Sequence, residues 1–531
     1  MEHILSYQVP IRSENHSLGF TFVQSIDHSQ SRSLGYAVSN LPVDKGADFL
    51  ANGEFSGKPE RTFSENNLVS FMARVQYALL DRYLLNAAVR IDGSSRFGIN
   101  NKWGKFPSVA VAWRINRENF LRDAASIDNL KLRLSYGIVG NQNGIANYAT
   151  LGLANPCAYE FGDNYHMGYL PGGELSNPNL KWERSATFNA GLDFGFWRDR
   201  LSGSVEYYTT RTNDLIVNRG ISSALGYTNM LDNLGETKSW GIDFNLTGMV
   251  LRKQNFSWEI GANLSLFRNE IVRIDDQLDA DGRPASQPGN RWFVGEPINV
   301  YYDYLTDGIF QYSDFDISTD NKGQTVYTLL PTIDTDGDGL PDKALDYETP
   351  REPGMIRIHD TDGDGRITAD DRVPIRRDPD FTMSLSTTLR WKGFDLFMDW
   401  YGVSGGYLRN PYLYEAASGG SLQGKTNGLR VNYWTPFNPS NEFPRPVHNS
   451  SVNYMSALAM QDASYIRLRT LSLGYTFPRE LISKIRIEKL RIYATATNLA
   501  TFTKVLSYSP ELTPGAYPEP QTFVFGVNLS F

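Results

Sequence analysis

The chain has 531 residues, a formal net charge of −8 and one cysteine, and these totals exclude several classes of protein. The negative charge argues against a nucleic-acid partner, and Cys157 alone allows neither an internal disulfide nor a cysteine-rich metal site. No run of eighteen apolar residues occurs, so the sequence predicts no transmembrane helix. Aromatic residues make up 13% of the chain and the mean hydropathy is −0.38, a combination typical of a membrane barrel whose strands face lipid with alternate residues.

Residues Met1–Tyr7 contain neither the basic region nor the apolar region of a secretory signal peptide. Met1 also falls inside or next to a predicted strand, whose upstream neighbour would be missing. We therefore expect the chain to be the C-terminal portion of a larger barrel, without a signal peptide of its own.

Alternation of apolar and polar residues predicts β-strands along the whole chain. After the tight turn at Asp81-Arg82, for example, Leu85, Ala87 and Val89 alternate with polar residues such as Asn86. The predicted strands are 18–22, 71–77, 83–92, 109–113, 130–138, 188–194, 201–207, 242–246, 258–266, 383–389, 396–400, 466–473, 490–496 and 521–531. Counting less regular stretches, roughly fifteen strands of the outer-membrane type are expected.

The last strand, Gln521–Phe531, has the clearest pattern. Phe523, Phe525, Val527 and Leu529 recur at every second position, and the chain ends on Phe531. A stretch of about ten residues is what a tilted strand needs to cross hydrocarbon. Outer-membrane barrels typically end on such an aromatic residue, so Phe531 is predicted to be part of the signal that the barrel-assembly machinery reads. A final strand of a soluble sandwich is the alternative.

The connections between the predicted strands alternate in length, and this favours a barrel over a sandwich. Counted back from the C-terminus, every second connection is short: 477–489, 391–393, 250–254, 196–200, 117–129, 79–82 and 10–15. The connections at 139–185, 268–380 and 402–463 are long. Short periplasmic turns and long outer loops are the asymmetry of outer-membrane barrels. The fold class is therefore predicted to be all-β, a transmembrane antiparallel β-barrel that occupies the whole of 1–531, with 268–380 as a long extracellular loop region.

Several local sequences, in this order and spacing, resemble the SusC/RagA family of TonB-dependent transporters from Bacteroidota. The segments that carry the resemblance are Arg90-Ile-Asp-Gly-Ser-Ser-Arg-Phe-Gly98, Trp103-Gly-Lys-Phe-Pro-Ser108, Leu134-Ser-Tyr-Gly-Ile-Val-Gly-Asn-Gln142, Asn177-Pro-Asn-Leu-Lys-Trp-Glu183, Val294-Gly-Glu-Pro-Ile298, Asp307-Gly-Ile-Phe-Gln311, Tyr433-Trp-Thr-Pro436, Ser464-Tyr-Ile-Arg-Leu-Arg469, Leu473-Gly-Tyr-Thr-Phe-Pro478 and Arg491-Ile-Tyr-Ala-Thr-Ala-Thr-Asn-Leu499. The resemblance covers essentially the whole chain.

The resemblance implies a barrel of about 22 strands around an N-terminal plug domain, of which this chain would supply the C-terminal part. It also implies the outer membrane of a Gram-negative, Bacteroidota-like cell, a SusD-like surface lipoprotein as lid, and contact with outer-membrane lipid. Nothing in the chain resembles the plug or the TonB box. Contact with TonB–ExbB–ExbD is therefore expected through the N-terminal part that this chain lacks.

The predicted function is TonB-dependent import of oligosaccharides, with peptides as the less favoured substrate. The alternative is a barrel fragment or half of a split receptor with only a structural role. A secreted calcium-dependent adhesin is a third possibility, disfavoured by the alternation of short and long connections. No acidic pair lies with a histidine or nucleophile in a catalytic arrangement, so we expect no enzyme.

Two acidic stretches within 268–380 suggest a structural Ca²⁺ ion. The first places oxygen ligands at positions 1, 3, 5, 9 and 12 of a loop of the EF-hand type, with Gly365 at the sharp turn and only the carbonyl of residue 366 available at position 7. Its candidate ligands are Asp360, Asp362, Asp364, Arg366, Thr368 and Asp371. The second and weaker candidate set is Asp334, Asp336, Asp338 and Asp342, which lacks the closing ligand. A solvated acidic turn without an ion is the alternative for both.

Aromatic residues gather in the predicted outer loops. Flat aromatic faces suit sugar stacking or contact with a partner protein. The candidates for ligand or partner contact are Trp292, Tyr301, Tyr302, Tyr407, Tyr412, Tyr414 and Trp434. Ordinary packing within the loops or an interfacial aromatic belt is the alternative.

Overall fold

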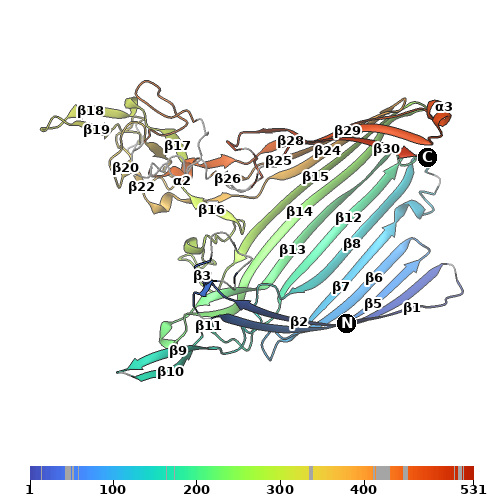
Figure 1. The fold of residues 1–531 in the computed structure, drawn as a ribbon, viewed down its shortest axis with the longest axis horizontal. Helices are drawn as coiled ribbons and strands as arrows, with labels where there is room; N and C mark the ends of the chain where they lie inside the picture. Colours follow the sequence, from blue (N-terminus) through green and yellow to red (C-terminus); the bar gives the residue numbers. More distant parts are fainter. Residues whose placement is uncertain are drawn as a thin grey trace. The chain divides into compact units, whose positions relative to one another are not determined.

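The structure is a computed structural model of the chain, shown in Figure 1. It describes residues 1–531 except 14, 42–49, 51–52, 58, 123, 163, 173, 334–338, 411–412, 414–430, 447–451, 508, 512–516 and 518. Among the described residues, no helix has the length and apolar character that a membrane-spanning helix requires.

The chain forms two compact units. The first unit comprises Met1–Phe194, Glu206–Ser239 and Val272–Pro284, and the second comprises Gly195–Val205, Trp240–Ile271 and Ala285–Phe531. Four long strands contribute residues to both units: β12 (Glu183–Phe196), β13 (Leu201–Gly220), β14 (Asn229–Lys253) and β15 (Phe256–Arg273).

Within the first unit, successive long strands are hydrogen-bonded neighbours in the order β1-β2-β5-β6-β7-β8-β12. Their bounds are β1 (Glu2–Gln8), β2 (His16–Gly35), β5 (Glu60–Leu79), β6 (Tyr83–Ser94), β7 (Trp103–Arg114) and β8 (Ile127–Asn141). The loops add two hairpins and one short strand: β3 (Val38–Ser39) with β4 (Glu54–Phe55), β9 (Ala154–Phe161) with β10 (Asn164–Pro171), and β11 (Glu174–Leu175) parallel to β14. Two 3₁₀ turns complete it, η2 (Ile115–Arg117) and η3 (Ser223–Leu225).

Within the second unit, the long strands are neighbours in the order β15-β24-β25-β28-β29-β30. Their bounds are β24 (Phe381–Trp391), β25 (Phe394–Ser404), β28 (Tyr465–Thr476), β29 (Lys489–Thr503) and β30 (Thr522–Ser530). Short loop strands are β16 (Val300–Asp303), β17 (Thr306–Ile309), β18 (Phe315–Thr319), β19 (Thr325–Leu329), β20 (Asp346–Tyr347), β21 (Ile356–Ile358), β22 (Arg366–Ile367), β23 (Val373–Arg376), β26 (Tyr407–Arg409) and β27 (Met460–Asp462). The helical turns are α2 (Met455–Leu458), α3 (Arg479–Ile482), η4 (Pro288–Asn290), η5 (Tyr312–Asp314), η6 (Ala369–Asp371) and η7 (Ser483–Ile485).

The register of the antiparallel pairs aligns apolar residues in continuous rows, because directly opposite residues share a face of the sheet. In the first unit one row runs through Leu18, Tyr77, Leu85, Val111 and Leu134. In the second unit a row runs through Trp258, Leu389, Leu396, Leu473, Ala494 and Phe525. Such rows are expected of a sheet that presents one face to lipid.

The opposite face carries small and polar residues in matching rows. In the first unit, Gly19, Gln76, Asn86, Ala110 and Ser135 are directly paired along the sheet. A one-residue slip of any strand would place its polar residues among the apolar ones, so the two rows fix the register.

The predicted strands are all confirmed, and most extend further than predicted. The strand expected next to Met1 is β1 (Glu2–Gln8), and the structure lengthens the pairing of β2 with β5 out to Gly35 and Glu60. The added ends of β2 and β5 are largely exposed, and their apolar and polar residues do not alternate regularly. Alternation could not reveal them for that reason.

Two of the short connections are tight turns whose backbone geometry fits hairpins. Lys392 and Gly393, the two residues between β24 and β25, both have positive φ, at 45° and 92°. Two successive positive φ values define the type I′ turn, which matches the twist of paired strands. Leu80 and Asp81 serve the same purpose between β5 and β6, with φ of 54° and 52°.

Replacing the terminal aromatic tests the predicted assembly signal. Phe531 is 81% exposed and directly follows β30. We expect Phe531→Ala to lower the amount of protein assembled in the outer membrane several-fold, measured by immunoblotting of membrane fractions. Ser530→Ala is the matched control and should leave that amount unchanged. Equal amounts of the two variants would contradict the prediction.

Candidate functional site

Two long connections of the second unit fold together into one domain-like structure, which we call the cap: the described residues of 285–376 and 405–462. Its buried core combines residues from both connections: Tyr304, Ile309, Ile356, Ile358, Ile367, Leu413, Trp434, Phe443, Met455, Ala457 and Ala459. Ile358 and Ala459 are completely buried. Because the core draws on both connections, each holds the other in shape.

Hydrogen bonds join the two connections at a central glutamine. The Trp434 indole N–H donates to Gln311 Oε1 at 2.9 Å, and Gln311 Nε2 donates to the backbone carbonyl of Ser440 at 3.2 Å. A partly buried ion pair also joins them, since Arg409 Nη2 lies 2.7 Å from Oδ2 of Asp303, which is 6% exposed. Gln311 and Trp434 belong to two of the segments that carried the family resemblance. Those segments therefore meet in the folded chain.

A second loop core, in the first unit, brings together two more of these segments. Phe97 and Trp182 pack together with ring centroids 4.5 Å apart, and Leu180 is completely buried beside them. The backbone of Gly98 lies so close to Pro178 that an added Cβ would be 1.9 Å from the Pro178 carbonyl oxygen. Glycine is therefore required at this contact. These sequence motifs have a structural role: they pack loops above the strands.

The structure brings three of the predicted metal ligands together. Asp360, Asp362 and Asp364 each offer a carboxylate oxygen, and these oxygens lie within 4.8 Å of one another. Backbone N–H groups of the loop donate to the same carboxylates, for example Gly365 N to Asp360 Oδ2 at 2.9 Å. Gly363 and Gly365 have φ of 74° and 78°, which lets the chain turn sharply between the carboxylates.

Asp371, the predicted closing ligand, has other partners. Its side chain is completely buried, and its two oxygens accept the backbone N–H groups of Thr361 and Thr368, both at 2.8 Å. It therefore fixes the two ends of the acidic loop. The hydroxyl of Thr368 accepts the backbone N–H of Asp370 at 3.1 Å, and Arg366 reaches the side chain of Asp346 at 3.3 Å.

The close carboxylates perturb one another. The backbone N–H of Asp364 donates to Asp362 and favours its ionised form, but desolvation and the nearby charges of Asp364, Asp371 and Asp360 outweigh this and raise the pKa of Asp362 above its ordinary value. A cation among these oxygens would relieve the repulsion.

Only part of the second, weaker acidic stretch belongs to the described residues. Asp334, Asp336 and Asp338 lie outside the described residues. The described Asp342 donates its backbone N–H to the carbonyl of Ile333 at 2.8 Å. Lys343, next to it, places its ammonium group 3.2 Å from the backbone carbonyl of Asp364, so the described end of the second stretch lies close to the first.

The aromatic residues predicted to contact a ligand or partner differ in how far their rings are exposed. Trp434 is 3% exposed and lies in the core of the cap. Tyr301 is flanked by the guanidinium groups of Arg377 and Arg409, 4.8 and 5.3 Å from its ring centre. Tyr302 packs on Phe293 with centroids 4.9 Å apart.

Two of the remaining aromatic candidates are accessible to different degrees. Tyr407 is 47% exposed and is the most open of the described candidates, and Trp292 is partly exposed. Tyr412 and Tyr414 lie outside the described residues. The arrangement leaves Tyr407 as the ring best placed for stacking on a ligand or a partner.

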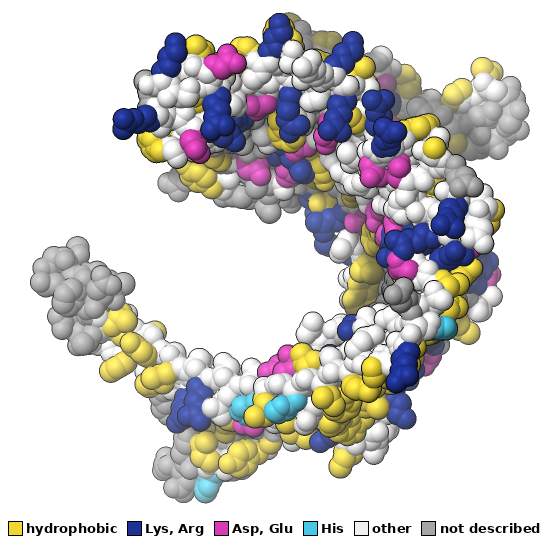
Figure 2. Space-filling view, turned by 90° about the vertical axis from the view of Figure 1, so that its right-hand side faces the viewer, with side chains coloured by type: hydrophobic (Ala, Val, Ile, Leu, Met, Phe, Trp, Pro, Cys, Tyr) yellow, Lys and Arg dark blue, Asp and Glu magenta, His cyan; other side chains and the backbone are white. Residues whose placement is uncertain are grey.

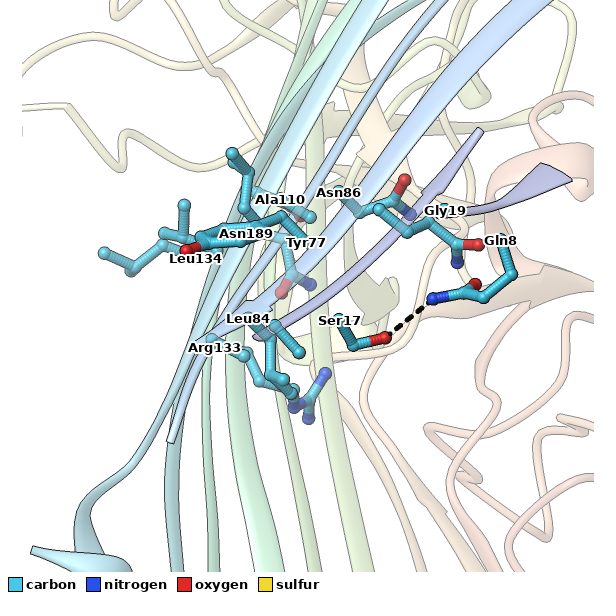
Figure 3. A pocket seen from close by; sticks show the side chains of 16 residues that line it. Gln8, Ser17, Gly19, Tyr77, Leu84, Asn86, Ala110, Arg133, Leu134 and Asn189 are labelled. Atoms are coloured by element: carbon cyan, nitrogen blue, oxygen red, sulfur yellow. Dashed lines mark hydrogen bonds between the residues drawn. The ribbon is translucent and has the colours of Figure 1, made fainter. Parts of the chain in front are cut away.

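The polar row of the first unit lines a shallow cavity of about 500 Å³, drawn in Figure 3. Gln8, Ser17, Asn86 and Arg133 contribute side chains to it, and Gln8 Nε2 donates to Ser17 Oγ at 3.0 Å. The hydroxyl and amide groups offer both donors and acceptors to a polar molecule that enters the cavity. Sequence reasoning recognised the alternation but missed this cavity, because it depends on which strands are neighbours.

Two arginines on the polar faces, Arg133 and Arg491, are held in ion pairs. Arg133 donates to Asp193 at 2.9 and 2.8 Å and also contacts Glu206. In the second unit, Arg491 donates to Asp395 at 3.0 and 2.5 Å. Such pairs fix these arginine side chains in place on the polar faces.

Comparison with known proteins identifies relatives along nearly the whole chain. The family model described as "TonB dependent receptor-like, beta-barrel" matches residues 5–499. TonB-dependent receptor P3 of Formosa agariphila is 32% identical over 91% of this chain and 47% of its own length. TonB-dependent receptor SusC of Bacteroides thetaiotaomicron is 30% identical over 88% of this chain and 44% of its own length.

A solved structure of the RagAB peptide importer in its "open-open" state has a similar fold. It matches with a TM-score of 0.77 and 25% identity, covering 100% of this chain and 54% of that chain. The chain thus spans about half the length of the relatives it matches.

Shortening one core residue tests whether the cap is a cooperatively packed structure. We expect Ile358→Ala to destabilise the cap by about 2–5 kcal/mol, because it removes three buried carbons and leaves a cavity. Hydrogen–deuterium exchange should show faster exchange in both connections, 300–376 and 431–462. The control Ile317→Ala changes a residue of the same cap that is 48% exposed, and it should leave exchange unaltered. Faster exchange confined to the connection that carries residue 358 would contradict a shared core.

Proposed function

Because the chain belongs to the TonB-dependent receptor β-barrel family, we propose that it supplies barrel wall and outer loops to an outer-membrane importer of the SusC type. The observation that carries the proposal is the pairing of an apolar row with a polar row along the same strands, together with a packed cap on the long connections. The paired apolar and polar rows suit insertion in lipid around a polar passage. The packed cap offers a shaped surface on which a ligand and a lid can bind.

We propose oligosaccharides as the substrate class. The supports are the polar wall around Asn86 and Arg133, rich in amide and charged hydrogen-bonding groups, and the open ring of Tyr407. Peptides are the second candidate, favoured by the similarity to the RagAB peptide importer. A passive barrel fragment is the less favoured alternative, because a cap with its own core and partly buried ion pair is more than a wall requires.

The partners follow from the family and are part of the proposal. A SusD-like surface lipoprotein would bind over the cap as a lid. Contact with TonB–ExbB–ExbD would come from the portion of the relatives that this chain does not match. We propose transport without catalysis, since the matching family model and relatives are described as receptors.

We also propose a divalent cation, Ca²⁺ first, as a structural element of the cap. The supports are the three converging carboxylates of Asp360, Asp362 and Asp364 and the spacing of the loop, which matches that of oxygen-ligated calcium loops. The ion would hold the loop in shape, and transport would not proceed through it.

Uptake by cells is the direct test of the proposed import. A deletion strain that regains the gene should accumulate a fluorescent oligosaccharide, and dissipation of the proton gradient should stop accumulation. Tyr407→Ala should reduce that uptake several-fold because it removes the open ring. Tyr136→Ala is the control, since Tyr136 has similar exposure, 46%, but is directly paired with Val109 in an apolar row. Uptake of labelled peptides alone would replace the oligosaccharide proposal with its alternative, and uptake of neither would contradict import.

Calcium removal tests the proposed ion. We expect Ca²⁺ to slow proteolysis of the cap and Asp362→Asn to abolish the effect. The apparent affinity should fall as the pH drops through the raised pKa of Asp362, because ligands must be deprotonated to bind metal. Asp370→Asn, a change of a nearby exposed carboxylate, should retain the response. Equal proteolysis with calcium and with chelator would contradict the proposal.

A further inference from the structure

The second unit carries charges of opposite sign at the two ends of its strands. The connection 285–379 contains nineteen Asp and Glu against nine Lys and Arg. The four turns at the other end, 197–200, 251–255, 391–393 and 477–488, contain three acidic and eight basic residues. A net charge of +5 in turns of a chain whose total is −8 is a marked local excess. We call these eight side chains the basic rim: Arg198, Arg200, Arg252, Lys253, Lys392, Arg479, Lys484 and Arg486.

All eight side chains of the basic rim are exposed. Among the described residues, none of them forms an ion pair, whereas Arg133 and Arg491 on the polar faces are paired. Figure 2 views the molecule from this end and shows Lys and Arg side chains gathered in its upper part, where the ends of β24–β30 lie. Unpaired cations at this density repel one another. They are stabilised when an anion approaches.

Exposed aromatic residues lie at the same strand ends. Trp197 is 56% exposed, Trp391 is 54% exposed and Phe394 is 46% exposed. Trp391 and Phe394 are directly paired and stacked, with centroids 6.3 Å apart, and the Lys392 ammonium lies 5.7 Å from the Trp391 ring. Aromatic rings next to cations, at the end of an apolar row, are characteristic of the boundary between hydrocarbon and headgroups.

A cavity of about 710 Å³ opens between two of these turns. Lys253, Arg390 and Lys392 line it together with Asp395, whose charge is already engaged by Arg491. Trp391 and Phe394, from the apolar face, line it as well. Since residues of both faces contribute, the cavity lies across the strand ends, where a headgroup can enter from the lipid side.

We propose that the basic rim binds the phosphate of anionic phospholipids in the periplasmic leaflet, with Lys253 and Lys392 of the rim and the neighbouring Arg390 forming one defined headgroup site. The anion could belong to a lipid or to an acidic protein, and the exposed aromatic residues favour a lipid. Trp197, Trp391 and Phe394 place these cations at headgroup depth, within reach of lipid phosphates. This inference rests on the proposed outer-membrane location.

Lipid binding by the protein purified from the outer membrane tests the proposal. The rim variant is Arg252→Gln, Lys253→Gln and Lys392→Gln combined. The matched control neutralises three exposed cations elsewhere in the second unit: Arg291→Gln, Lys322→Gln and Lys504→Gln. Binding of phosphatidylglycerol and phosphatidylcholine from mixed micelles is measured for both variants and the parent protein. Each basic residue near an anionic surface adds to the binding free energy. The rim variant, which lacks three of them, should therefore bind phosphatidylglycerol at least about tenfold more weakly than the parent protein.

The expected result is preference for phosphatidylglycerol in the parent and control proteins and its loss in the rim variant. Equal loss in the control, or equal binding of the two lipids by the parent, overturns the proposal. Displacement of lipid by inorganic phosphate or by a polyglutamate peptide at matched ionic strength also overturns it, since the site would then be one for small anions or acidic protein. Membrane fractionation separates the two levels of the account: absence from the outer membrane refutes the proposed function, whereas presence without lipid preference refutes only this inference.

Discussion

The structure depends on one constraint: in hydrocarbon, every backbone N–H and C=O group must find its hydrogen-bond partner within the protein. Antiparallel pairing of long strands satisfies the constraint, and the period of two then divides each strand into an apolar and a polar face. The row from Trp258 to Phe525 and the polar residues opposite it are two consequences of one register. The polar wall, its ion pairs and its shallow cavity exist because the other face is committed to lipid.

The ends of the strands are under a different constraint, and the chain treats the two ends differently. Where connections are short, as at the type I′ turn of Lys392-Gly393, the chain forms only a turn between two strands. The charge and the exposed aromatic rings of these turns are then their distinguishing features. Where connections are long, water competes for the backbone, and the loops are ordered by cores of their own. The Gln311–Trp434 and Phe97–Trp182 contacts show how residues far apart in sequence do this.

The strands could be predicted from the sequence because their signal is local. Alternation in 83–92 or 521–531 is visible in ten residues, and β6 and β30 lie where it indicates. The loops could not, because their signal is long-range. Nothing near Trp434 reveals that Gln311 accepts its indole N–H, and nothing near Asp371 reveals that its oxygens are taken by Thr361 and Thr368. The three neighbouring carboxylates of the acidic loop were predictable because they follow one another in sequence, whereas the cavity beside Asn86 required the order of strands.

Cysteine accessibility tests the orientation that underlies this account most directly. With Cys157 replaced by serine, single cysteines are placed at Lys322, in the turn between β18 and β19, and at Lys392, in the turn between β24 and β25. A membrane-impermeant maleimide is then applied to intact cells and to permeabilised cells. The account predicts labelling at position 322 in intact cells and at position 392 only after permeabilisation. Labelling of both positions in intact cells, or at position 392 alone, would contradict a sheet that crosses the outer membrane with its short turns in the periplasm.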